Sequence, residues 1–286
     1  MLDDKWRLVW SIINEPTAAR DLRNANLVDA NLQGALLQNA DLYHANLTSV
    51  DLRGADLRHA DLTLARLHQS VIDTTTHLDD KWQLVWQIVN RTELAQQLTA
   101  ADLSHANLDG AYLRQADLSD ARLMFVSLVD GDLREANLTN SQWMSATLRQ
   151  STLRAAALRN ANLRGADLTN VDLSLADLRG LQIDETTVLS ARWRRIWVLV
   201  QDEKAGRTFD RMDLGWTNFV DADFTGASLI GVNFSNALLR GTDFRNADLR
   251  NGDFHGADLT GADFRGANLT NARFEGAILD GTLGLE

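Results

Sequence analysis

Apolar residues recur at every fifth position along most of this chain. Leucine fills this position without a break from Leu22 to Leu67, and a second run extends from Leu103 to Leu178 with Trp143 as its one substitute. A third run, of phenylalanine and leucine, extends from Phe209 to Leu279. A period of five fits neither the 3.6-residue period of an α-helix nor the two-residue period of a strand. The chain must therefore repeat on another geometry.

A square coil satisfies this period. A small residue usually stands two positions before each apolar centre, as Ala25 and Ala30 do. If the chain turns a right angle every five residues, each centre points to a common axis and the small residue fits beside it. Four sides then make one coil of about 20 residues, and stacked coils pair at roughly the 4.8 Å spacing of neighbouring strands. The sequence predicts an all-β solenoid with four sides.

The repeat unit resembles that of the pentapeptide-repeat family, whose motif is A(D/N)LXX. The motif appears here literally as Ala55-Asp56-Leu57-Arg58-His59 and as Ala161-Asn162-Leu163-Arg164-Gly165. The resemblance covers most of the chain. It implies a right-handed quadrilateral β-helix, and the right-handed sense comes from the resemblance alone.

The third run alternates phenylalanine with leucine from Phe224 to Leu279. Ten residues are half a coil, so the phenylalanines should lie on two opposite sides of the solenoid. Each set should then form a ladder of rings inside the core. Core filling is the role that this pattern favours.

A second repeat interrupts the first. The segment Leu2–Asn14 recurs as Leu78–Asn90 and, in degenerate form, as Leu189–Gln201, each with two tryptophans. These segments resemble an arrangement seen in cyanobacterial members of the family. We predict three amphipathic helices, with Asp3, Asp79 and Ser190 as their N-caps.

The apolar stripe of the first helix comprises Leu2, Trp6, Val9, Trp10 and Ile13, which share one helical face. We expect this stripe to lie on the solenoid and to cap its N-terminal end, where unpaired edges would otherwise face water. The alternative is that the paired tryptophans anchor a partner.

The predicted organisation has six parts. They are an N-terminal capping helix (1–19), repeat block 1 (20–76), an inserted helix (77–95), repeat block 2 (96–187), a second inserted helix (188–206), and repeat block 3 with a C-terminal cap (207–286). Block 1 holds fewer coils than the three or so units that a stable solenoid needs. We therefore expect one stacked body carrying two inserted helices.

The sequence offers little chemistry. It has no cysteine, which excludes disulfides, thiolate metal sites and cysteine nucleophiles. No two of the six histidines are one coil apart, so no metal-binding pair is predicted on adjacent coils. We predict a protein that is not an enzyme and needs no cofactor or metal. It has neither a signal-peptide pattern nor an apolar run of bilayer length, and a cytoplasmic location is expected.

The surface is therefore where function is expected. The net charge of -11 is spread along the chain with arginines interleaved. Residues one coil apart should stack, which predicts a basic column and an acidic column. Their members are Arg114, Arg134 and Arg154, and Asp223, Asp243 and Asp263. These columns could dock a charged partner, or neighbouring opposite charges could simply compensate them.

Two functions follow. The first is a protein-interaction scaffold that presents the faces of a solenoid to a protein partner, with no direct binding of nucleic acid or membrane. The alternative comes from the family, in which some members imitate DNA and bind DNA gyrase. The interleaved arginines and the inserted helices count against it.

Two alternatives stay open at the C-terminus. Leu283 and Leu285 either fold over the last coil or meet a second chain. We favour a homodimer through this end, as is seen in parts of the family.

Overall fold

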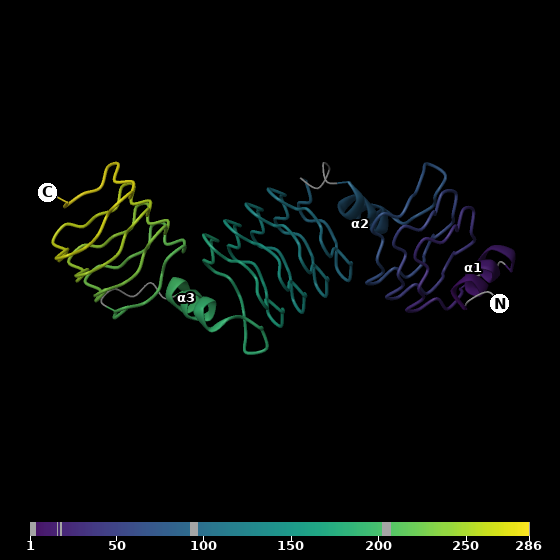
Figure 1. Ribbon diagram of the computed structural model, residues 1–286, viewed down its shortest axis with the longest axis horizontal. Coiled ribbons are helices and arrows are strands. Elements are labelled where there is room, and N and C mark those ends of the chain that lie inside the picture. Colours follow the sequence, from purple (N-terminus) through teal and green to yellow (C-terminus); the bar gives the residue numbers. More distant parts are fainter. Residues whose placement is uncertain (1–3, 16, 18, 92–96, 202–206, 286) are drawn as a thin grey trace. The chain divides into compact units, whose positions relative to one another are not determined.

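The computed structural model describes residues 4–15, 17, 19–91, 97–201 and 207–285. Three α-helices, α1 (Asp4–Asn14), α2 (Asp80–Asn90) and α3 (Ala191–Gln201), lie among runs of coils (Figure 1). The three predicted helices are confirmed, and each ends at the predicted residue. No helix in the described part of the chain is long and apolar enough to cross a membrane.

The chain divides into two compact units. Unit 1 comprises Met1–Thr152, Ala161–Val171 and Gln182–Val188, and it contains α1 and α2. Unit 2 comprises Leu153–Asn160, Asp172–Leu181 and Leu189–Glu286, and it contains α3. The boundary falls inside the predicted block 2. The six-part organisation and the single stacked body stay predictions.

Within each unit the coils repeat every 20 residues. Isolated parallel β-bridges join Asp21 to Asp41 in unit 1 and Asp223 to Asp243 in unit 2. Each bridge is held by backbone bonds such as that from the Leu22 amide to the Asp41 carbonyl, 2.8 Å long. Each side of the coil thus contributes a single bridging position, with a turn on either side of it.

Most corners in the described part of the chain are β-turns whose third residue is left-handed. At the first such corner Ala25 N donates to the Leu22 carbonyl at 3.0 Å, and Asn24 has φ +56°. This is the pattern of a type II turn, which favours Gly or Asn at that position. The Asp21 carboxylate accepts a bond from the Arg23 amide at 3.2 Å. The Asp or Asn of the motif therefore holds the corner as well as facing water.

The apolar centres fill the axis as predicted. Leu57 and Phe254 are completely buried, and Trp143 is buried with its indole donating to the Ser141 hydroxyl at 2.7 Å. The phenylalanine ladders are confirmed. Rings one coil apart stack at 4.9–5.5 Å between centroids, and the two ladders meet edge to face across the axis. Their members are Phe224, Phe244 and Phe264, and Phe234, Phe254 and Phe274.

Helix α2 lies between the coils of block 1 and those of block 2. Towards block 1, the Trp86 indole donates to the Ser70 carbonyl and the Asn90 amide donates to the Leu67 carbonyl, both at 2.9 Å. Towards block 2, Lys81 Nζ donates to the Ser104 carbonyl at 2.6 Å. Beside the helix the coils touch directly, since the Leu64 amide donates to the His105 carbonyl at 2.8 Å. We call this set of contacts the α2 junction.

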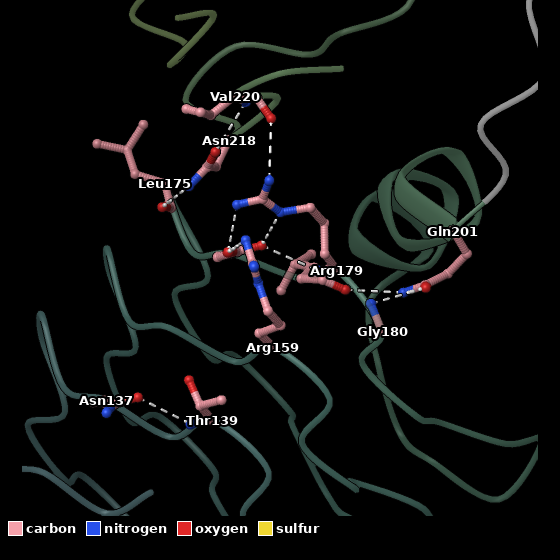
Figure 2. A network of polar contacts seen from close by, with 11 residues as sticks. Asn137, Thr139, Arg159, Leu175, Arg179, Gly180, Gln201, Asn218 and Val220 are labelled. Atoms are coloured by element: carbon pink, nitrogen blue, oxygen red, sulfur yellow. Dashed lines mark hydrogen bonds and ion pairs between the residues drawn. The ribbon is translucent and has the colours of Figure 1, made fainter. Parts of the chain in front are cut away.

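Helix α3 makes the same contacts inside unit 2, each 111 residues further along the chain than its α2 counterpart. Figure 2 shows part of this α3 junction, where Gln201 of α3 meets Gly180 and Arg179 reaches the Val220 carbonyl. The recurring bonds are Trp197 to Leu181, Gln201 to Leu178, Arg192 to Gly215 and Leu175 to Trp216. The two inserts are therefore one structural device used twice.

Helix α1 departs from the prediction. Ile12 is buried, but Trp6, Trp10 and Ile13 are 40%, 55% and 41% exposed. The prediction that these three residues lie on the solenoid is wrong. In α2 the equivalent tryptophans are covered by the coils of block 1, whereas α1 contacts the coils through its other side. Leu2, the first member of the predicted stripe, lies outside the described residues.

Two of the predicted N-caps, Asp79 and Ser190, stand directly before their helices, but only Ser190 makes the capping bond. Asp79 precedes α2 as predicted, yet its side chain makes no capping bond. Its carboxylate instead accepts the His59 amide on the neighbouring coil, at 3.2 Å. Ser190 Oγ does accept the Trp193 amide, at a long 3.4 Å. Asp3 lies outside the described residues.

Candidate protein-binding surface

The predicted basic column divides among different partners. Arg114 donates to Glu135 at 2.7 Å, and Arg134 forms a two-bond pair with Asp132 at 2.6–2.8 Å. Arg154 lies in unit 2, with its guanidinium 4.7 Å from the Trp216 ring centroid. The three arginines are therefore not a free basic stripe.

The three aspartates of the predicted acidic column are stacked as expected, and two of them, Asp243 and Asp263, are paired with arginines. Parallel bridges join Asp223 to Asp243 and Asp243 to Asp263. The guanidinium of Arg265 binds Asp263 and lowers the pKa of that carboxyl to about 2. Arg245 binds Asp243 in the same way and lowers its pKa.

This pairing decides what the columns can offer. Each Arg and Asp are two residues apart on one side of the coil, so the same ion pair recurs wherever the motif reads D-L-R. Such exposed pairs add little stability, roughly 0–1 kcal/mol each. They do place alternating charges at a fixed spacing on the surface. The role of the six predicted residues in binding stays a prediction.

Sequence reasoning missed a different surface, which lies beside the α2 junction. Phe125 occupies a corner with φ +57° and is 49% exposed. Its ring stacks on that of His105, one coil earlier, at 4.9 Å. Left-handed backbone costs a non-glycine residue about 1–2 kcal/mol, and a bulky side chain there is an outlier. Most other corners carry Gly, Asn, Asp, Gln or Ser.

A groove of about 480 Å³ opens next to these rings. Its lining includes His44, Leu64 and Arg66 of block 1 and Asn107, Asp109 and Phe125 of block 2. The groove therefore lies where the two blocks meet beside α2.

The floor of this groove is polar and internally bonded. Asn107 is buried and its amide donates to the Asp109 carboxylate at 3.1 Å. The same carboxylate accepts the Ser127 hydroxyl at 2.6 Å and the Val129 amide at 2.9 Å. A fixed polar floor beside an exposed aromatic ring is the mixture that protein interfaces use.

The α3 junction repeats the aromatic corner. Trp216 has φ +57° and is 40% exposed, and it stands at the position equivalent to His105. Arg154 covers one face of its ring. A sequence signal for both sites existed: a large aromatic two residues after an apolar centre, where the repeat otherwise places a small or polar residue.

Comparison with known families decides the classification. The family described as pentapeptide repeats matches residues 25–63, 101–140, 144–180, 217–256 and 247–283, together more than half of the chain. The chain belongs to the pentapeptide-repeat family. The resemblance drawn from the motif is thereby confirmed. A search of curated proteins gave no match.

Pentapeptide-repeat proteins are also among the solved structures that this chain is similar to. HetL from Nostoc sp. strain PCC 7120, a protein involved in heterocyst differentiation regulation, is 22% identical over 99% of this chain and 94% of its own, with a TM-score of 0.26. Rfr23 from the cyanobacterium Cyanothece 51142 is 23% identical over 58% and 91%, with a TM-score of 0.25. Full-length QnrB1, a plasmid-mediated fluoroquinolone resistance protein, is 12% identical over 90% and 92%, with a TM-score of 0.23.

No group of three or more His, Cys, Asp or Glu side chains among the described residues could hold a metal ion. The described surface of this pentapeptide-repeat solenoid includes ion-paired columns, two aromatic corners and the groove beside α2. These features suit contact with another macromolecule more than chemistry on a small one.

Proposed function

We propose that this chain is a non-enzymatic protein-interaction scaffold, and that the groove beside the α2 junction receives a segment of a protein partner. Phe125 would supply an apolar anchor, and the bonded floor of Asn107, Asp109 and Ser127 would supply fixed polar partners. We further infer that the coil has the right-handed sense implied by the family motif.

The exposure of Phe125 at a left-handed corner carries this proposal. The left-handed backbone of Phe125 is unfavourable for folding, and little of its side chain is buried to offset this, since 49% of the residue is exposed. When a residue destabilises the fold and its packing does not compensate for this, a role in function is the best explanation for its presence. An aromatic ring on a rigid support is also a favoured anchor in protein interfaces.

The alternative of an acidic DNA mimic that binds gyrase has weaker support. A mimic of the phosphate backbone needs carboxylates that present negative charge to the partner. Here Asp243 and Asp263 are each held by an arginine, which cancels that charge locally. A supercoiling assay with the purified protein tests this alternative, and inhibition or protection of gyrase would support it over the scaffold.

The scaffold is tested with Phe125→Asn. Asparagine suits the left-handed corner, so the melting temperature should stay equal or rise. Protein captured from an extract of the source cells should lose its main partner, and that purified partner should bind at least tenfold more weakly. Tyr112→Thr is the matched control, because Tyr112 is an exposed aromatic 42% accessible at a bridge position away from the corner. Unchanged affinity in Phe125→Asn would overturn the groove as the binding site.

A further inference from the structure

Helix α1 carries an apolar face that is about half exposed in the described part of the chain. Trp6, Trp10 and Ile13 are between 40% and 55% exposed. Three large apolar side chains on one helical face are a contiguous patch of the kind that marks an interaction site.

Helices α2 and α3 show what such a face binds. The equivalents of Trp6 and Trp10 in α2 are Trp82 and Trp86, each only 8% exposed. Trp86 covers the last coil of block 1 and donates to the Ser70 carbonyl. In α3, Trp197 covers the last coil before it and donates to the Leu181 carbonyl. In both cases the face closes the C-terminal end of a run of pentapeptide coils.

The C-terminal end of block 3 is an uncovered coil of the same type. Its centre Leu279 is 39% exposed, whereas Ile278 and Leu283 occupy outward-facing bridge positions like that of Val71 in block 1. At the equivalent end of block 1, which α2 covers, the centres Leu62 and Leu67 are buried.

The last turn of block 3 also matches the turn that α2 recognises. In block 1 the Ser70 hydroxyl donates to the Leu67 carbonyl at 2.7 Å. In block 3 the Thr282 hydroxyl donates to the Leu279 carbonyl, also at 2.7 Å. The two carbonyls that α2 binds, those of Leu67 and Ser70, therefore have counterparts in the carbonyls of Leu279 and Thr282.

We infer that the exposed face of α1 binds the last coil of block 3 in a second copy of this chain. In this contact the Trp10 indole would donate to the carbonyl of Thr282 and the Asn14 amide to that of Leu279, as Trp86 and Asn90 do inside unit 1. The contact reproduces between molecules an interface that the chain already builds twice within itself. It does not depend on the groove beside the α2 junction.

Such a contact joins two different surfaces, so it is heterologous. A heterologous contact leaves one α1 face and one C-terminal coil free after each addition, and it therefore builds open chains unless the rotation closes a ring. The expected assembly grows with concentration. A pairing of two C-terminal ends would instead stop at a closed dimer.

Sedimentation velocity over a range of concentrations tests the inference with two variants. The head variant, Trp6→Glu with Trp10→Glu, removes the α1 face, and the tail variant, Leu279→Glu, removes the coil face. Trp6, Trp10 and Leu279 are 40%, 55% and 39% exposed, so both variants should fold, which circular dichroism checks. The native chain should form species above a dimer, and each variant alone should stay at 31.8 kDa.

The mixture of the two variants gives the decisive result. The tail variant still has an α1 face and the head variant still has a C-terminal coil, so a one-to-one mixture should form a heterodimer and nothing larger. Tyr112→Glu, an exposed aromatic elsewhere, should assemble like the native chain. A native chain that stays monomeric at every soluble concentration, or a dimer that persists in the head variant, would overturn the inference. A dimer that survives only in the head variant would establish pairing through the C-terminal ends instead.

Discussion

Helices α1 and α2 have nearly the same sequence but different surroundings. They share the segment Asp-Lys-Trp-x-Leu-Val-Trp-x-Ile, and each bonds the chain that follows it, α1 through Ser11 and α2 through Lys81. Of these two helices, α2 also lies against the coils of block 1, which precede it. Trp86 of α2 is therefore only 8% exposed, whereas the equivalent Trp10 of α1 is 55% exposed. The same side chain is thus part of the core in one place and part of the surface in the other.

This difference shows that the helix is a two-sided connector. One side carries an isoleucine that is buried in both helices, Ile12 in α1 and Ile88 in α2. The other side carries the two tryptophans and the side-chain amide of Asn90, and in α2 it binds the last coil of the preceding block. This second side is buried in α2 and exposed in α1.

The largest difference in stability is expected between alanine substitutions of Trp86 and of Trp10. Trp86→Ala removes a buried ring and its bond to the Ser70 carbonyl, and it should cost about 3–5 kcal/mol at the α2 junction. Trp10→Ala should change stability by at most about 0.5 kcal/mol in dilute, monomeric protein, because the ring is exposed there. Hydrogen exchange of the Leu64 amide, which is bonded across the α2 junction, measures local opening.

Trp197→Ala is the matched control for this comparison. It should open the α3 junction, reported by the Leu175 amide, and leave Leu64 protected. If Trp86→Ala and Trp10→Ala lowered stability equally, the hypothesis that the helix binds coils through two sides would be contradicted.

A smaller effect should separate Asn90 from Asn14. The Asn90 amide bonds both the Leu67 carbonyl of block 1 and the Trp86 carbonyl of its own helix. Asn14 makes only the bond within its helix, to the Trp10 carbonyl at an exposed site. Asn90→Ala should therefore cost about 1–2 kcal/mol and Asn14→Ala under about 0.5 kcal/mol.

Hydrogen exchange of the Leu64 and Leu175 amides again measures the opening of each junction in these variants. Gln201→Ala should behave like Asn90→Ala, because Gln201 bonds the equivalent Leu178 carbonyl. If Asn14→Ala opened α1 as strongly as Asn90→Ala opens the α2 junction, the bond to the preceding coil would not be what holds the helix.

The repeat made the coil predictable, because a period of five leaves one arrangement that buries every leucine. The phenylalanine ladders followed from the same arithmetic, since ten residues are half a coil. The helices were predictable from the recurrence of their segment. The chemical role of the motif aspartate was not: the bond from Asp21 to the Arg23 amide depends on a left-handed corner that periodicity does not reveal.

The burial of the helices could not be predicted from their own sequence. The stripe of α1 is as apolar as that of α2, and only the presence of a coil on each side decides which tryptophans are covered. The groove beside the α2 junction could not be predicted from the sequence for a related reason. It is formed by Leu64 and Phe125, which lie far apart in sequence and meet only because α2 is inserted between their coils.

One further feature is shared by the junctions of α2 and α3. Before each helix the coil gains one residue, and the bridges join Asp56 to His77 and Asp167 to Val188, 21 residues apart. An aspartate organises each enlarged turn. In the second turn the Thr186 hydroxyl, the largest cause, and the Gly165 and Thr187 amides lower the pKa of Asp184 to about 2. In the first turn the Thr75 hydroxyl is the main cause that lowers the pKa of Asp73.

The smallest expected effect is the pH dependence of these turns. Because the pKa of Asp184 is lower in the folded chain than its ordinary value of 3.8, its ionised form stabilises the fold fully above about pH 4. That contribution should be lost as the pH falls from about 4 towards 2. In Asp184→Asn the Gly165 amide, which bonds this carboxylate at 3.2 Å, should exchange faster than in the native chain at pH 6, and the difference should shrink towards pH 2. Asp73→Asn should act in the same way on the Gly54 amide, 3.3 Å from its acceptor. A constant difference at all pH values would mean that the turn is held by geometry and not by the charge, and a response at only one of the two turns would end the equivalence of the two junctions.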